Sequence, residues 1–178
     1  MKETPAEAAA ILTEGSESLD ALFSRLSRDA AEARGTIGSG AWSARDLAGH
    51  IETWEEVALR TIEDIRAGRP PDIRNTVTDE ASLDLFNAAE IERKEVRGWE
   101  ETVTSFRATN ARLVATIRTI ADDDWGRVPP GTRDDRTLTF GEHVGSTTGM
   151  PAHPFRHAWA HLPDLEAFVH TATEGPQT

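Results

Sequence analysis

Apolar side chains recur every three or four residues along three long stretches of this chain, and this period constrains its fold most strongly. Residues at that spacing lie on one face of an α-helix, which must then be buried against other helices. The three stripes consist of Ile11, Leu12, Leu19, Leu22, Phe23 and Leu26, of Leu47, Ile51, Trp54, Ala58, Ile62 and Ile65, and of Val103, Phe106, Leu113, Val114, Ile117 and Ile120. No segment has the strict alternation of a half-buried strand. The pattern therefore predicts an all-α protein.

Capping boxes and glycines mark where the helices should begin and end. A Ser or Thr followed three residues later by a carboxylate opens a helix, and glycine or proline closes it. We expect helices from Thr4 to Gly35 with a bend at Gly15, from Ser43 to Gly68, over 79–96, from Gly98 to Ile120, and in two pieces after Thr139 with a break near Gly149. Residues 72–78 and 122–136 should be loops, and Pro163 should limit the last long helix before a short one at 165–170.

The length of the chain fits one domain. A chain of 178 residues can bury a core without disulfides, and this one contains no cysteine. We expect residues 1–178 to form a single four-helix bundle with extra short helices, in which residues 171–178 are a disordered tail.

Charge and composition bear on the partners. The formal net charge of −12 should repel a phosphate backbone, so we expect no nucleic acid as a partner. No stretch is apolar enough for a signal peptide or a membrane span, so we expect a cytoplasmic protein with no membrane contact. A small-molecule substrate is the expected partner, and a homodimer is an open alternative to the monomer.

Three histidines are the candidate metal ligands. His153 and His157 are four residues apart, so they lie on the same side of a helix if His153 falls in its first turn. His50 lies on the flank of the stripe that begins at Leu47, and it would complete the site from another helix. His161 extends the row by one turn and is a rival ligand. The alternative is that an aromatic face opposite the row forms the core and the histidines face water.

At these residues the chain resembles the DinB/YfiT-like superfamily of four-helix bundles, which includes mycothiol-dependent maleylpyruvate isomerases, thiol transferases and relatives of the colibactin self-resistance protein. The matching motifs are Trp42-Ser43-x-x-Asp46-Leu47-x-x-His50-x-x-x-Trp54, Ala67-Gly68-x-Pro70, Phe86-Asn87-Ala88 and His153-x-x-x-His157. The resemblance implies that His50, His153 and His157 bind a divalent metal. Members of the family often carry an aromatic residue such as tyrosine after the first histidine of the pair, where this chain has Pro154 and no tyrosine anywhere.

All-nitrogen ligation suits zinc, which we expect first, and also nickel, cobalt or iron. Three protein ligands leave open positions, as in catalytic rather than structural sites, and the ion can activate water or a thiol such as mycothiol. We therefore expect a metal-dependent hydrolase, thiol transferase or isomerase that adds water or a thiol to a small electrophilic metabolite, in detoxification or self-resistance. The alternative is a non-catalytic protein that binds or sequesters a small molecule in the bundle cavity.

Four further residues are candidates for substrate binding. They are Trp54, Asn87, Asn110 and Arg156. Asn87 matches a family position, Asn110 is a polar residue on an apolar stripe, and Arg156 can neutralise a carboxylate. Each has a structural alternative, namely a turn cap, a core hydrogen bond and a solvated arginine. Most of the glutamates that follow His50, at positions 52, 55 and 56, should face water.

Overall fold

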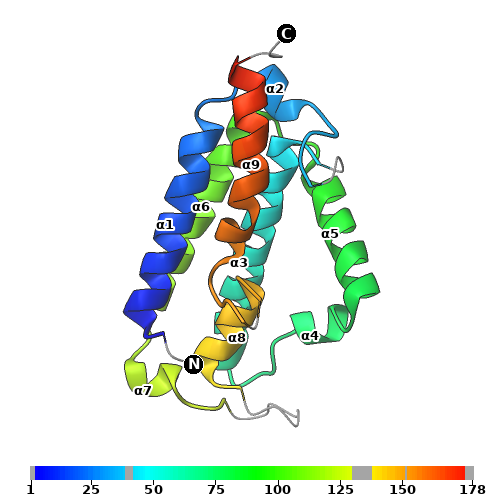
Figure 1. Cartoon of the computed structure of the whole chain (residues 1–178). Coiled ribbons are helices and arrows are strands. Elements are labelled where there is room, and N and C mark those ends of the chain that lie inside the picture. The colour runs from blue at the N-terminus through cyan, green and yellow to red at the C-terminus, as the bar shows by residue number, and fades with distance from the viewer. Residues whose placement is uncertain (1–2, 39–41, 130–137, 151, 175–178) are drawn as a thin grey trace.

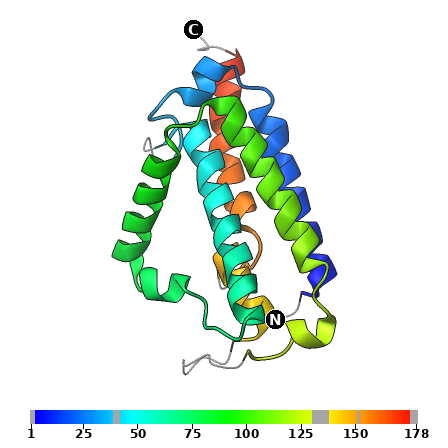
Figure 2. The same cartoon turned by 180° about the vertical axis from the view of Figure 1, so that it is seen from behind.

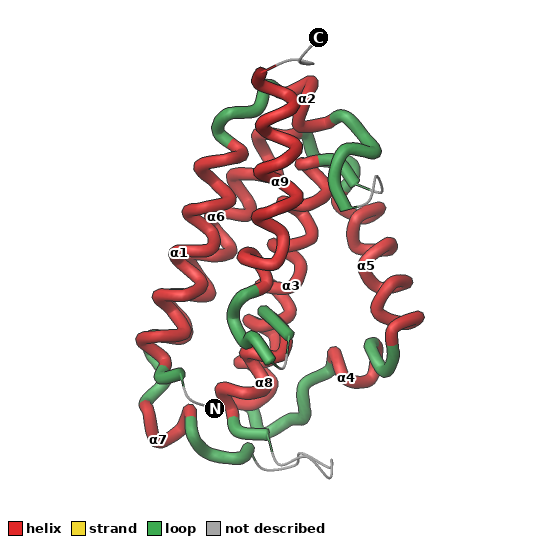
Figure 3. Tube along the Cα trace, in the orientation of Figure 1, coloured by secondary structure: helices red, strands yellow, loops and turns green. Residues whose placement is uncertain are grey.

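The computed structural model describes residues 3–38, 42–129, 138–150 and 152–174. All regular structure in these ranges is helical, and Figure 3 shows helices joined by loops without a strand in the described part. Two isolated bridges, between Ile37 and Trp42 and between Met150 and His153, are the only β-type pairings there. The expected all-α class is confirmed.

Four long helices form the bundle. They are α1 (Pro5–Phe23), α3 (Ala44–Arg66), α6 (Trp99–Ile117) and α9 (His157–Glu174). Figures 1 and 2 show them side by side, and the most extensive contacts join α3 to α6, α1 to α6 and α1 to α9. Their apolar stripes face one another, so the bundle buries two adjoining apolar clusters between the helices. None of the described helices is both long and apolar enough to cross a bilayer.

Shorter helices connect and flank the four. They are α2 (Arg28–Glu32), α4 (Ile73–Thr76), α5 (Glu80–Lys94), α7 (Asp122–Trp125) and α8 (Phe140–Thr147). Figure 1 shows α4 and α5 forming an arch beside α3, outside the bundle, while α8 packs against α3. The extra short helices of the expected fold are therefore present.

The expected helix boundaries hold where a side chain caps the helix. Thr4, Ser43 and Thr139 each accept a hydrogen bond from the residue three positions later, whose carboxylate bonds back to the cap. The first helix does not continue to Gly35, because Ser27 caps a separate helix, α2. Single helical turns, α4 and α7, occupy parts of the two expected loops.

Gly15 and Pro163 have other roles than those expected. α1 continues as one helix through Gly15, and a Cβ at this position would lie 2.9 Å from the indole nitrogen of Trp159, so glycine allows α9 to approach. Pro163 does not end α9, which runs on to Glu174, because the proline is exposed while Leu165 and Val169 are fully buried and hold the following turns on the bundle. Residues 171–174 of the expected tail are therefore helical, and 175–178 lie outside the described residues.

Candidate metal centre

Three histidines from two helices converge at one point in the bundle. His157 Nε2 lies 3.1 Å from His50 Nε2 and 3.2 Å from His161 Nε2. One ligand nitrogen from each of the three lies within 4.8 Å of the others, and no other group of this kind occurs among the described residues. We call His50, His157 and His161 the three-histidine site.

Local sequence presents each imidazole to this point. His50 is 5% exposed, because it lies on α3 beside the buried Leu47 and Ile51. His157 and His161 occupy the first two turns of α9 and are four residues apart, so their side chains lie one above the other. The backbone N–H of His157 donates to the carbonyl oxygen of Thr148, at 2.9 Å, which fixes the start of α9 against the end of α8.

His153 does not join the three-histidine site. Its side chain is exposed and it precedes α9, in the connection where its N–H donates to the carbonyl oxygen of Met150. The expected helical turn from His153 to His157 is absent, because Phe155 has a φ of 63° and no right-handed helix passes through that conformation. The rival ligand His161 therefore takes the place that was predicted for His153.

The connection into α9 is held by close packing. Phe155 is fully buried and stacks on Trp125, with ring centroids 5.9 Å apart. A Cβ at Gly149 would lie 2.3 Å from the carbonyl oxygen of His153, so only glycine allows the chain to fold back at this distance. The left-handed Phe155 and the bare backbone of Gly149 thus set the position at which His157 begins α9.

Burial keeps the three imidazoles neutral. Burial, followed by the charges of the two neighbouring histidines and of Lys94, holds the pKa of His50 well below 6.5. Burial and the neighbouring His161 lower the pKa of His157 to about 3. Burial also lowers the pKa of His161, against a smaller opposing effect of Asp164. The ring nitrogens therefore carry lone pairs at neutral pH, as metal ligation requires.

The separations of these nitrogens fit a shared transition metal. Imidazole nitrogens that ligate one ion at ~2.1 Å lie about 3.0–3.4 Å apart for the usual angles, a range that includes the separations of 3.1 and 3.2 Å in this structure. Without an ion, His157 Nε2 can donate its single proton to only one of its two neighbours. An ion held by His50, His157 and His161 would use all three lone pairs and keep open positions.

Two tryptophans form walls beside the three-histidine site. The Trp42 ring lies 4.6 Å from that of His50, and the Trp54 ring lies 6.4 Å from that of His157. Trp54 is held in place by α5, because its indole N–H donates to Asn87 Oδ1 at 3.1 Å and its ring packs edge-on against Phe86. Of the four expected substrate-binding residues, Trp54 therefore lies at the site, and Asn87 orients it.

The other two candidates lie elsewhere. Asn110 is buried between helices, where its amide donates to Glu55 Oε1 at 2.7 Å and to the carbonyl oxygen of Leu12 at 3.4 Å, so it serves the core. Burial raises the pKa of Glu55 to about 8, despite the hydrogen bond from Asn110. The side chain of Arg156 is exposed next to His157.

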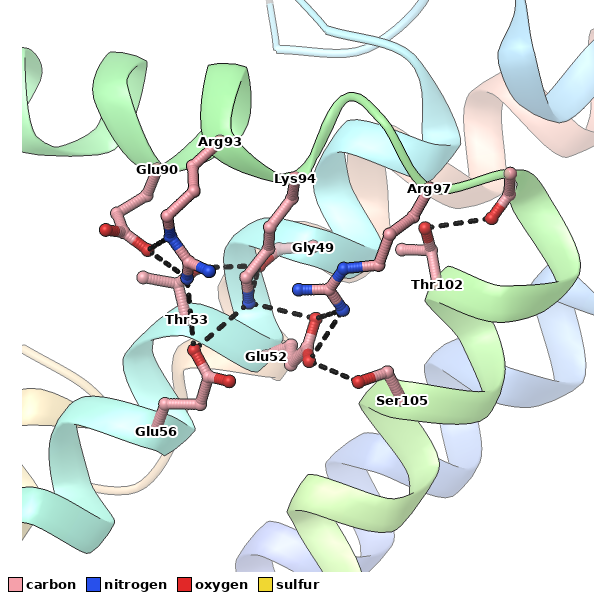
Figure 4. Close-up of polar contacts among 11 residues, drawn as sticks. Gly49, Glu52, Thr53, Glu56, Glu90, Arg93, Lys94, Arg97, Thr102 and Ser105 are labelled. Carbon is pink, nitrogen blue, oxygen red and sulfur yellow. Dashed lines mark hydrogen bonds and ion pairs between the residues drawn. The ribbon is translucent and has the colours of Figure 1, made fainter.

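Glu52 of α3 is the centre of a buried ion cluster with Lys94 and Arg97 (Figure 4). Glu52 is 1% exposed and accepts from Lys94 Nζ at 2.9 Å, from Arg97 Nη1 at 3.0 Å and from Ser105 Oγ at 2.5 Å. Burial by itself would raise the pKa of Glu52, but these hydrogen bonds and the Lys94 charge outweigh it and lower the pKa. The expectation that most of the three glutamates face water is wrong, since Glu52 and Glu55 are both buried. Their partners lie on α5, on α6 and in the connection between these two helices, so residues close to the glutamates in sequence do not reveal them.

Comparison with known proteins places this geometry in a family. The sequence profile of the DinB superfamily matches residues 11–162. An uncharacterised protein from Escherichia coli UTI89 is similar in structure, with a TM-score of 0.76 and 19% identity over 96% of this chain and 95% of that one. The colibactin self-resistance protein ClbS, solved in complex with dsDNA, has a TM-score of 0.73 and 15% identity over 94% of this chain and 98% of that one. No curated protein matches the sequence at a significant level.

The ClbS complex corrects one expectation. Net charge argued against any nucleic acid partner, yet a protein of this fold has been solved on a DNA duplex. Total charge is a property of the whole surface, whereas a duplex contacts only one face, so a charge of −12 does not exclude DNA. The fold, the three-histidine site and the profile match over residues 11–162 agree, and the chain belongs to the DinB superfamily.

Proposed function

We propose that this protein is a divalent-metal-dependent enzyme that adds water or a low-molecular-weight thiol to a small electrophilic molecule. The convergence of three neutral imidazole nitrogens on one point, from α3 and α9, is the observation that carries the proposal. His50, His157 and His161 would hold the ion, with zinc as the first candidate and nickel, cobalt or iron as alternatives. When bound, such an ion acts as a Lewis acid that lowers the pKa of water or of a thiol.

The rest of the chemistry follows from the residues that the chain has. The sequence has no cysteine thiol to serve as nucleophile, and the attacking group that we propose is water or an added thiol such as mycothiol, activated by the ion. Trp42 and Trp54 flank the histidines and offer apolar faces to the body of a substrate while they exclude bulk water. The self-resistance role of ClbS, which shares the fold at 15% identity, supports a role in detoxification.

Metal content tests the ligand set. Protein purified without a histidine tag should carry about one transition metal ion per chain. His50→Ala, His157→Ala and His161→Ala should each lose most of it, whereas His153→Ala is the matched control and should retain it. Circular dichroism checks that each variant folds. If His153→Ala lost the metal and His161→Ala kept it, the ligand would be His153 and not His161.

Turnover separates catalysis from mere binding. A small epoxide should be consumed only by metal-loaded protein, and oxygen-18 from labelled water, or an added thiol, should appear in the product. Consumption by the metal-free protein would contradict the proposal. A metal-loaded protein that binds the epoxide and leaves it unchanged would favour the alternative, a non-catalytic binding protein that uses the same cavity.

A further inference from the structure

A cavity of about 240 Å³ lies beside the three-histidine site, between α3, the α4–α5 arch and α8. Figures 1 and 2 show how α4 and α5 stand off from α3 at this level. The arch contributes apolar side chains, Ile73, Val77 and Leu83, and α3 contributes Trp54. A cavity of about 150 Å³ takes up benzene in another protein, so this one has room for a somewhat larger single-ring molecule.

The lining selects against charge. No Asp, Glu, Lys or Arg is among the described residues that line the cavity. The polar wall from α8 includes Ser146 and Thr147, whose hydroxyls donate to the carbonyl oxygens of His143 and Val144 at 2.8 and 2.7 Å. Because their protons are used in this way, the two hydroxyl oxygens can only accept hydrogen bonds from a ligand. Thr61 and His143 complete the polar lining, so an anion would meet no Lys or Arg side chain here, whereas a neutral hydroxyl or amide N–H would find an acceptor.

The cavity shares a wall with the histidines. Trp54 lines it, and the same indole ring lies 6.4 Å from the ring of His157. On the α8 side, Thr147 lines it, and the next residue, Thr148, accepts the N–H of His157. Trp54 therefore borders both the cavity and the first turn of α9.

We infer that this cavity binds the body of the substrate, and that the substrate is a small uncharged molecule with an apolar ring or chain and a hydrogen-bond donor. The inference rests on the proposed function for its reaction. Because no Lys or Arg is among the described residues that line this cavity, we expect it to bind anionic metabolites, such as unsaturated acids, less well than neutral ones.

The test uses two probes of the same shape, 2-phenoxyethanol, which is neutral and has a hydroxyl donor, and phenoxyacetate, which is an anion. Isothermal titration on the full chain, with and without zinc, should show that phenoxyethanol binds more tightly by at least about tenfold, or ~1.4 kcal/mol. Val77→Trp fills the cavity and should weaken the binding of phenoxyethanol by a similar factor without changing metal content. Val96→Trp is the matched control, because Val96 is 90% exposed in the connection between α5 and α6, and it should bind like the wild type.

Three outcomes would overturn the inference: no binding of phenoxyethanol up to about 10 mM, equal or tighter binding of phenoxyacetate, or unchanged affinity in Val77→Trp. These results are distinct from failure of the proposed function. A protein that binds phenoxyethanol in the cavity and holds no metal would contradict only the metal-dependent reaction. A protein that holds metal in the three-histidine site and rejects phenoxyethanol would contradict only the substrate class.

Discussion

Replacement of Lys94 by methionine should destabilise the protein strongly, because it breaks a buried ion cluster from one side. Lys94 is 4% exposed, and its Nζ lies 2.9 Å from Glu52 Oε2, 3.3 Å from Glu56 Oε2 and 3.2 Å from the carbonyl oxygen of Gly49. Methionine keeps the length of the aliphatic chain that packs on Gly49 and removes the ammonium group, with its charge and its hydrogen bonds.

The expected loss in the free energy of unfolding depends on the hydrogen-bond donors that Glu52 keeps in the variant. Removal of one partner of a buried pair costs about 3–5 kcal/mol when the other charge is left uncompensated. Arg97 and Ser105 still donate to Glu52 in the variant, so we expect the lower end of that range, about 3 kcal/mol. For a chain of 178 residues, this corresponds to a fall in Tm of roughly 6–12 °C.

Urea unfolding of metal-free protein measures this loss of stability, and two further variants serve as controls. Arg127→Gln breaks an ion pair with Asp124 whose side chains are 67% and 55% exposed, so it should cost no more than about 0.5 kcal/mol. The double variant Glu52→Gln/Lys94→Met removes both buried charges and should recover at least about 1 kcal/mol of the loss. The reasoning is refuted if Lys94→Met costs no more than Arg127→Gln, since the cluster would then be hydrated in solution.

Three further perturbations test other parts of the structure. Burial raises the pKa of Glu55 from 4.5 to about 8. The stability that the protonated Glu55 carboxyl contributes to the folded state is therefore complete below pH 4.5 and is lost as the pH rises through 8. The stability of Glu55→Gln relative to the wild type should therefore grow by roughly 3 kcal/mol between pH 4 and pH 7 in urea unfolding, and parallel pH profiles would place this carboxyl in water. Gly149→Ala should weaken zinc binding by at least about tenfold, because a Cβ there meets the His153 carbonyl oxygen at 2.3 Å. Gly126→Ala, whose nearest contact is an ordinary 3.6 Å, should bind zinc like the wild type, and equal affinities in the two variants would show that the connection into α9 adapts freely. Zinc affinity should stay nearly constant from pH 8 to about pH 6, because burial lowers the pKa of all three histidines of the three-histidine site. A loss centred near the ordinary histidine pKa of about 6.5 would mean that the imidazoles are exposed to water.

Local sequence was sufficient to predict most of the long helices and to place one histidine of the three-histidine site. The apolar stripes and the boxes at Thr4, Ser43 and Thr139 predicted where α1, α3 and α8 begin, because capping and amphipathicity depend only on residues within a turn or two. The same period placed His50 on the buried flank of α3, where the structure has it. The row of histidines four apart also indicated a metal site, because that spacing alone brings imidazoles together on one side of a helix.

Which histidines of that row face His50 was decided by tertiary structure alone. The spacing of His153 to His157 equals that of His157 to His161, so the sequence period cannot choose between them. The choice depends on where α9 starts, and that depends on the left-handed Phe155 packing on Trp125 and on the approach of the chain to Gly149.

Tertiary structure also decided the burial of Glu52 and Glu55. Glu52 and Glu55 look like ordinary polar residues of an amphipathic helix, since nothing within a turn of them on α3 neutralises their charge. Their burial depends on Lys94 and Arg97 for Glu52 and on Asn110 for Glu55, all of which lie more than a helix away in the sequence. A helical period reports which side of a helix turns inward, whereas the pairing of a buried charge or the convergence of ligands depends on distances between helices that only the packed bundle sets.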